Sequence, residues 1–462
     1  MADELTWRIE KEQYKWHPLY QYVESVMAIS GLGMYRAGLY NPQTNQLTAD
    51  FDVNDFNSLL QFCWDLYNGK YNDTPAKIYH NNEALKELLV KFDPLIINCY
   101  NGFVLFKYKK YVELNDMGYG SDFFDLYNGL YLECRSVVFD IMGEHGVDIV
   151  LAPQPKFFNV NENEKWSDEI VRQKINKAVK VEISNKLDGS NQNYRWYNGK
   201  IIGSGSQALD PDASWRLNDG YNLLTSGYEE MIKAYPDYTF MFEYISPKNI
   251  IVVNYTKEQE GLYLFGMRNV YTGKQLTYDE VLEIGRKYGV KCTDVYNNSY
   301  DEILDSVDNY TSDEKEGWVI GLMDKNGDIF KAKLKTTDYV LMHKAITKLI
   351  SPKFIIEAIN EGRWDDAYAK VPIGLKDIAN DIAKKVYRYM AVIDAQVEEY
   401  YVQYHDLDRK DFMITVDKEV PRVMVGHVKN LYLGKPVNYL KGANGRWTKL
   451  KEIEKFLSIF DN

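Results

Sequence analysis

The chain has 462 residues, of which 45% are hydrophobic and 26% are charged. This globular composition excludes wholesale disorder, and the length indicates two or three domains of roughly 100–200 residues each. The net charge of −12 argues against a protein that coats nucleic acid, because such proteins present a broad positive surface.

Export and metal-binding cysteine motifs find no support in the sequence. No apolar run reaches the roughly 20 residues that a membrane span needs, and the opening MADELTWRIEKEQYKW lacks the apolar core of a secretory signal. Cys63, Cys99, Cys134 and Cys292 lie far apart with no C-x-x-C pair. We therefore expect an intracellular protein without a membrane partner, with reduced and packed cysteines.

Residues 1–120 mix helical and extended patterns. Apolar side chains recur at helical spacing in residues 54–69, and Gly69 is placed to end that helix. No residues there suggest chemistry, so the sequence predicts an N-terminal α/β extension of unknown function.

Residues 121–345 have a different pattern, with short alternating or β-branched runs bounded by turn residues. Asn198-Gly199 and Asn326-Gly327 each separate two such runs, which is a strong hairpin signal. These features predict a mostly antiparallel sheet domain. Seven of the runs are expected as strands: Ser136–Ile141, Val179–Ile183, Tyr194–Tyr197, Thr239–Ile245, Leu262–Met267, Trp318–Met323 and Ile329–Leu334.

Residues 346–462 return to helical spacing. Apolar residues step by three or four from Leu375 to Tyr404, which predicts one helix of roughly 30 residues and about 45 Å. This part carries 19 basic against 17 acidic residues, and eight of the basic ones fall within 421–455. An all-helical domain that binds RNA through this basic segment is one interpretation, and a merely solvated tail is the other.

One short motif suggests covalent chemistry. Lys186 ends a β-rich run and is followed by Leu187, Asp188 and Gly189. A lysine at a strand end beside a glycine that allows close backbone approach suits a ligand-binding nucleophile, with Asp188 and Gly189 beside the ligand. Alone, K-x-D-G is weak evidence, because a surface lysine before a turn has the same pattern.

An ordered set of further motifs strengthens the case. In chain order they are Glu133-Cys-Arg135, Lys156-Phe-Phe158-Asn159, Phe240-Met-Phe-Glu243, Glu316-Gly-Trp and Phe330-Lys331-Ala-Lys333. With Lys186 between the second and third, this set resembles the covalent nucleotidyltransferase superfamily of ATP-dependent ligases and capping enzymes. More narrowly, it is similar to the phage-type RNA ligase 1 family of tRNA-repair ligases.

The resemblance implies an α+β protein with a mostly antiparallel, ATP-grasp-like ligase core. It implies that Lys186 attacks the α-phosphorus of ATP. That lysine must then be neutral although its ordinary pKa is about 10.4. Lys331 and Lys333 are two apart on an expected strand, so both project from one face, where they would lower the pKa of Lys186 and bind the triphosphate.

Other roles are implied by the resemblance alone. Arg135 and Lys156 would contact phosphates or nucleotide, and Glu243 the ribose hydroxyls. Glu316 would support metal binding and nucleotide position. Phe158 would pack against the nucleotide, although a core position is an equal alternative.

An acidic pair, Asp365-Asp366, follows Lys333 at about the same distance as an acidic pair in the family that resembles metal ligands. The resemblance therefore implies a metal role for this pair. Adjacent acids are also common at helix starts, where they favour the helix dipole.

Two positions depart from the family pattern. Where the family has a lysine in an S-K-G-S-like element, this chain reads Gly203-Ser204-Gly205-Ser206, and Lys200 is a candidate replacement. Ser136 follows the E-C-R element where the family usually has glycine, a change that affects backbone freedom.

The sequence thus predicts an ATP-dependent RNA ligase that joins a 5′-phosphate to a 3′-hydroxyl through a lysyl-AMP, with Mg²⁺ or Mn²⁺. The family implies tRNA broken in its anticodon loop as substrate, and a polynucleotide kinase/3′-phosphatase as functional partner. We expect a monomer in the cytoplasm, that of a host cell if the protein is of bacteriophage origin. The alternatives are a catalytically silent RNA-end-binding protein, a DNA ligase and a GTP-using capping enzyme.

Overall fold

The computed structural model describes residues 40–41, 46–47, 94–109, 114, 118–120, 123–125, 129–140, 148–442 and 446–460. These residues form two compact units. The first holds the described residues up to Pro247 together with Tyr255–Thr336, and the second holds Lys248–Asn254 together with the described residues from Thr337 onward. The helix expected at 54–69 lies outside the described residues.

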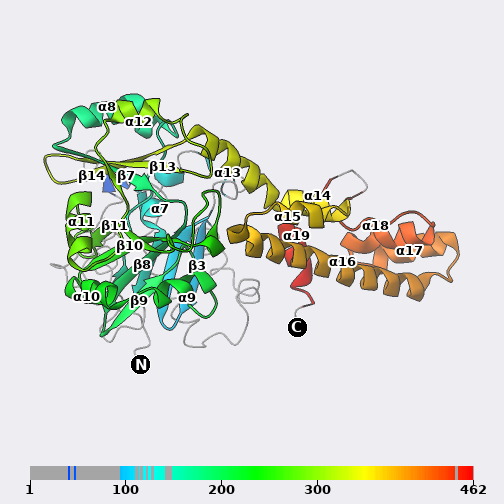
Figure 1. Cartoon of the computed structure of the whole chain (residues 1–462). Helices are drawn as coiled ribbons and strands as arrows, with labels where there is room; N and C mark the ends of the chain where they lie inside the picture. The colour runs from blue at the N-terminus through cyan, green and yellow to red at the C-terminus, as the bar shows by residue number, and fades with distance from the viewer. Residues whose placement is uncertain are drawn as a thin grey trace. The chain divides into compact units, whose positions relative to one another are not determined.

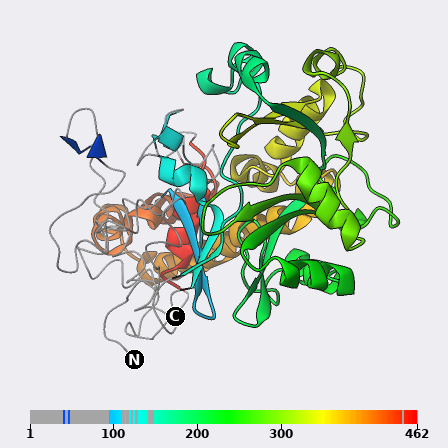
Figure 2. The same cartoon turned by 90° about the vertical axis from the view of Figure 1, so that its left-hand side faces the viewer.

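Three four-stranded antiparallel sheets build the first unit (Figures 1 and 2). The first sheet has the order β3 (Leu95–Tyr100), β4 (Phe103–Tyr108), β5 (Arg135–Asp140), β6 (Asp148–Leu151). The second has the order β11 (Gly261–Asn269), β10 (Tyr238–Ile245), β8 (Ser190–Tyr197), β9 (Lys200–Ser204). The third has the order β12 (Val295–Tyr296), β7 (Lys180–Lys186), β13 (Gly317–Met323), β14 (Ile329–Lys335).

Each strand expected from the sequence is present, with bounds that differ by a few residues, and the expected α+β class is confirmed. Asn198 (φ 48°) and Gly199 (φ 81°) are both left-handed and join β8 to β9 as a two-residue hairpin. Asn326-Gly327 lies in the longer loop 324–328 between β13 and β14, where Gly327 (φ 79°) has a left-handed backbone.

Helices cover the sheets because alternate strand residues are apolar. The second sheet packs Phe240, Phe242 and Leu264 with α10 (Ser226–Ala234) and α11 (Tyr278–Lys287). One face of the third sheet, formed by residues such as Ile183, Trp318 and Leu334, packs with α8 (Asp168–Lys177) and α12 (Tyr300–Asp305). The opposite face of the third sheet is thereby left for polar side chains.

A buried ion pair ties the E-C-R element to the second sheet. Glu133, at the end of α7 (Leu130–Glu133), accepts from Arg268 of β11 at 2.6 and 3.0 Å. The two side chains are 8% and 2% exposed. The acid of this motif therefore stabilises the fold.

We expect Glu133→Gln to lower the free energy of unfolding by about 3–5 kcal/mol, because it leaves the Arg268 charge buried without its counter-ion. Urea unfolding of the full chain measures this. Pairing Glu133→Leu with Arg268→Met should recover part of the loss, since no charge then remains buried. A single variant as stable as the wild type would contradict this role.

The second unit is helical (Figure 1). Its longest helix, α16 (Lys376–Tyr404), has 29 residues, which confirms the helix expected from the sequence. Apolar residues of α16 such as Val386, Ile393 and Val397 form its buried core. The other helices are α13 (Thr337–Leu349), α14 (Pro352–Asn360), α15 (Trp364–Ala369), α17 (Arg409–Glu419), α18 (Arg422–Tyr432) and α19 (Leu450–Leu457).

The segment Lys248–Asn254, between β10 and β11, belongs to this helical unit. Val252 and Val253 are buried, and the Gly374 amide donates to the Ile250 carbonyl at 2.9 Å. A Cβ at Gly374 would lie 2.7 Å from the same oxygen, so the close approach requires glycine.

Among the described helices, none has both the length and the apolar character needed to cross a membrane. Cys134 and Cys292 are free thiols, as expected, whereas Cys63 lies outside the described residues.

Candidate active site

The polar face of the third sheet gathers lysines through its strand register. Gly317 of β13 aligns with Lys186 of β7 on one side and with Lys335 of β14 on the other. Two residues further along β13, Val319 aligns with Ser184 and Lys333, and Gly321 then aligns with Glu182 and Lys331. Because aligned residues share a face, Lys186, Lys331, Lys333 and Lys335 all project to the same side.

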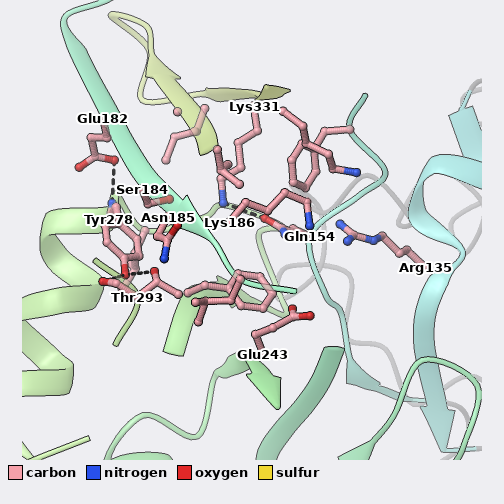
Figure 3. Close-up of a pocket in the computed structure, with 18 residues that line it drawn as sticks. Arg135, Gln154, Glu182, Ser184, Asn185, Lys186, Glu243, Tyr278, Thr293 and Lys331 are labelled. Carbon is pink, nitrogen blue, oxygen red and sulfur yellow. Dashed lines mark hydrogen bonds between the residues drawn. The ribbon is translucent and has the colours of Figure 1, made fainter. Parts of the chain in front are cut away.

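A pocket opens on this face. Figure 3 shows Lys186 between Arg135 and Gln154 on one side and Tyr278 and Thr293 on the other. Besides these five, the lining residues include apolar Phe157, Phe265, Leu276 and Val319, and polar Ser184, Asn185, Glu243, Lys331 and Lys333. The pocket thus combines a strongly cationic region with apolar walls, which suits a ligand that carries both phosphates and a planar base.

Glu316 bridges two lysines of this face. One of its oxygens is 2.7 Å from Lys186 Nζ and the other is 2.9 Å from Lys335 Nζ, and its side chain is 4% exposed. The register explains the bridge, because Glu316 directly precedes the residue that aligns with both lysines. Gly317 is required there: its φ is 152°, and a Cβ would lie 2.1 Å from the Leu334 carbonyl oxygen.

The pKa of Lys186 differs from our expectation. Burial favours its neutral form, but the carboxylates of Glu316, Glu243 and Asp188 outweigh burial, and the pKa is raised. The expectation that neighbouring cations lower the pKa of Lys186 was therefore wrong for the protein without a bound ligand. These carboxylates therefore favour the protonated form of Lys186, and Glu316 holds its amine in an ion pair at 2.7 Å.

The neighbouring lysines have the lowered pKa values instead. Burial, helped by Arg135, lowers the pKa of Lys331 to about 8, while its amine donates to Gln154 Oε1 at 2.7 Å. Burial and the charges of Lys156, Arg135 and Lys186 hold the pKa of Lys333 well below its ordinary value, and its amine lies 4.4 Å from the Phe157 ring centre. Crowded cations of this kind favour a polyanionic ligand.

Arg135, the first residue of β5, lines the pocket. Its Nη1 atom is buried and has no hydrogen-bond partner among the described residues, and its guanidinium lies 5.3 Å from the Phe157 ring centre. A buried donor without an acceptor is costly, so this nitrogen points to a ligand that supplies the acceptor.

The K-F-F-N element runs beside β14 but reaches the pocket through a different phenylalanine. Phe157 lines the pocket, whereas Phe158 packs on Phe124 and Trp166, which corresponds to the core alternative. Lys156 is not among the lining residues: its amine faces the rings of Tyr108, Phe124 and Phe158 at 4.9–5.9 Å. Burial lowers its pKa to about 8.

Glu243 faces the pocket from β10 and accepts from the Gly189 amide at 3.1 Å. Burial raises its pKa to about 7 although the Lys186 charge opposes this. Asp188 is 3% exposed, and its amide donates to Tyr255 Oη at 2.9 Å. The residues after Lys186 are therefore fixed to the second sheet, with Gly189 needed because a Cβ would lie 2.3 Å from the Tyr244 carbonyl oxygen.

Ser136 carries the backbone strain that its position implied. Its φ of 71° is left-handed, and it is the extra residue of a bulge between Phe106–Val137 and Lys107–Arg135 of β4 and β5. Glycine usually fills such a position, so the serine performs a backbone role at a conformational cost.

Lys200 does not act as a pocket lysine. It lies at the exposed start of β9, with its amine 5.8 Å from the Phe103 ring centre, and it is not among the lining residues. The structure therefore gives no support to the suggestion that it replaces the missing lysine of the S-K-G-S-like element.

Asp365 and Asp366 occupy the first turn of α15 in the second unit and are exposed. This is the helix-start alternative, and their metal role stays a prediction. Within the described part of the chain no three acidic, histidine or cysteine side chains group as a metal cage.

Three residues that contact the site were not predicted from the sequence. Lys335 pairs with Glu316 and Gln154 accepts from Lys331. Tyr255 accepts from the Asp188 amide. Lys335 continues the alternation of Lys331 and Lys333, so its position on the polar face was readable. The other two reach the site from distant loops that carry no local pattern.

Comparison with known proteins gives one family match and several likenesses to solved structures. Residues 133–339 match a family model described as RNA ligase. The chain also resembles an archaeal ATP-dependent RNA ligase at 14% identity and a TM-score of 0.41, over 84% of this chain and 98% of that one. An RNA ligase of Naegleria gruberi with PPi shows 17% identity and a TM-score of 0.30, over 45% of this chain and 67% of that one. A putative ATP-dependent DNA ligase from Aquifex aeolicus shows 12% identity and a TM-score of 0.37, over 77% of this chain and 100% of that one.

Proposed function

We propose that this protein, whose residues 133–339 match a family model described as RNA ligase, is an ATP-dependent RNA ligase that joins a 5′-phosphate to a 3′-hydroxyl through a lysyl-AMP. The observation that carries the proposal is Lys186 at the end of β7, facing a pocket lined by Arg135, Lys331 and Lys333. These groups supply a nucleophile and the cations that its substrate needs.

The reaction has three steps. The amine of Lys186 attacks the α-phosphorus of ATP, a P–N bond forms, and pyrophosphate leaves. A 5′-phosphate oxygen of RNA then attacks the same phosphorus, and the P–N electron pair returns to Lys186. Finally the RNA 3′-hydroxyl attacks the 5′-phosphate and AMP leaves.

The pocket cations serve each step. Phosphoryl and nucleotidyl transfer depends mainly on position and on neutralising spread negative charge. Arg135, Lys331 and Lys333 would meet the phosphates, Glu243 the ribose, and the apolar walls with Phe265 the base. Lys156 would act through the charge it adds behind Lys333, since it does not line the pocket.

A divalent cation fits beside Glu316. Mg²⁺ is commonly bound by one or two carboxylates together with substrate phosphates, and the carboxylates of Glu316 and Glu243 both lie close enough to Lys186 to raise its pKa. Such an ion, held by these carboxylates, would supply positive charge near Glu316 and the phosphates. Lys335 would keep hold of Glu316 when Lys186 is released.

The substrate would be nicked structured RNA, with anticodon-loop breaks in tRNA as the first candidate, and a polynucleotide kinase/3′-phosphatase would prepare its ends. The helical unit would bind this RNA. Some of its basic residues are already paired, as Lys429 is with Asp417 at 2.5 Å, but Lys435, Lys449 and Lys451 are exposed. Their charge supports phosphate contacts.

Sealing of a nicked RNA hairpin tests the proposal. We expect the full chain with ATP and Mg²⁺ to convert 5′-phosphate and 3′-hydroxyl ends into an intact strand, with AMP and pyrophosphate released. GTP in place of ATP and a nicked DNA hairpin in place of RNA are the controls. Joining that requires GTP or DNA, or RNA binding without joining, would overturn it.

A further inference from the structure

The loop after β9, residues Ser204–Ala208, is held against the first sheet by three of its strands. The side-chain amide of Asn98, in β3, donates to the Gln207 carbonyl, and the Lys107 amine of β4 donates to Ser206 Oγ. Ser136 Oγ of β5 donates to the Ser206 carbonyl at 2.6 Å. The loop therefore lies directly over the bulge of β5.

The register places Lys107 next to a pocket residue. Lys107 aligns with Arg135 across the bulge, so the two side chains project from the same face of the first sheet. Arg135 lines the pocket and carries the buried nitrogen without a partner, whereas Lys107 is not among the lining residues. Arg135 thus lies in the pocket, and Lys107 lies next to it outside the pocket.

A cation in this position suits a phosphate that does not belong to the bound nucleotide. Arg135, Lys331 and Lys333 already place three basic groups in the pocket. Lys107 lies outside the pocket, beside the exposed hydroxyl of Ser206. A second phosphate that must approach the α-phosphorus would meet Lys107 first and Arg135 next.

We propose that Lys107 and Ser206 bind the 5′-phosphate of the RNA and position it for attack on the adenylate held by Lys186. This rests on the proposed ligase function. In that step an oxygen of the 5′-phosphate forms a P–O bond with the α-phosphorus, the P–N bond breaks, and its electron pair and a proton go to the Lys186 nitrogen. Lys107 holds the attacking group and takes no proton.

The contact with Ser206 has a purely structural alternative, in which Lys107 only holds the loop. Charge separates the two roles. Glutamine at position 107 can still donate to Ser206, so it retains a loop contact while removing the positive charge that a phosphate needs.

Lys107→Gln is therefore the test variant, with Lys200→Gln as its matched control, because Lys200 is an exposed lysine of the neighbouring hairpin away from the pocket. Two rates are measured on the full chain: formation of lysyl-AMP from ATP, and single-turnover transfer of AMP from the isolated adenylate to a 5′-phosphorylated RNA. The readout is the ratio of the second rate to the first.

We expect this ratio to fall about 10- to 100-fold in Lys107→Gln, the usual effect of losing one charged hydrogen bond, and to stay unchanged in Lys200→Gln. Lys107→Arg should restore most of it. The salt dependence of RNA binding should also weaken by roughly 0.7–0.9 in the log–log slope, as for one lost phosphate contact.

Equal losses in both rates, or no change in their ratio, would overturn the role of Lys107. Wild-type chain that forms no lysyl-AMP at all would instead overturn the proposed ligase function. The two failures are thus distinguishable in one experiment.

Discussion

A Lys186→Ala variant is expected to retain no covalent label after incubation with α-labelled ATP and Mg²⁺, whereas the wild type carries the label through denaturation. In the proposed mechanism this amine is the attacking group, so its removal would lower the rate by several orders of magnitude and leave no side chain to bear the adenylate. The label is measured on denaturing gels, and mass spectrometry locates it.

Lys186→Arg separates nucleophile from ion pair. An arginine at position 186, the end of β7, can still pair with Glu316. Its guanidinium stays protonated, however, and cannot attack phosphorus. We expect a folded and unlabelled protein. Label that persists in either variant would show that another residue is the nucleophile.

Lys333→Met is expected to lower kcat/KM for lysyl-AMP formation by about 10²- to 10³-fold and, at the same time, to stabilise the fold. In the proposed mechanism the lysine supplies charge to the phosphates, but without them it is crowded by Lys156, Arg135 and Lys186. Methionine retains the packing on Phe157 without the charge. We expect Tm to rise by roughly 2–4 °C, or about 1 kcal/mol, measured by thermal unfolding in the absence of ATP.

The stability difference should depend on pH in a defined direction. Because the folded state lowers the pKa of Lys333 below its ordinary 10.5, the unfolded chain binds more protons between those two values. Wild-type stability therefore recovers as pH rises through that window, and the advantage of Lys333→Met shrinks. An advantage that stays constant from pH 7 to 10 would show that packing, and not charge, explains it.

Local pattern was sufficient for the framework of the site. The alternation in β14 places Lys331 and Lys333 on one face, the turn dipeptides locate two hairpins, and the apolar period defines α16. Each of these depends on residues close in sequence. The order of motifs added the chemistry, which spacing alone did not supply.

Through-space relations were not readable in the same way. The raised pKa of Lys186 follows from Glu316, 130 residues away in the chain, and the contact of Lys107 with Ser206 spans 99 residues. Phe157 lines the pocket, whereas Phe158 takes the core position that was its alternative, because adjacent residues of this irregular segment point in different directions. Such outcomes depend on how the sheets meet.

The segment between β10 and β11 has a consequence for dissecting this protein. The segment Lys248–Asn254 groups with the described residues from Thr337 onward, although it lies between two strands of the second sheet. A fragment cut after β14 would leave the Ile250 carbonyl without the Gly374 amide that donates to it. A shortened form of the protein that ends after β14 would therefore need the segment Lys248–Asn254 removed as well.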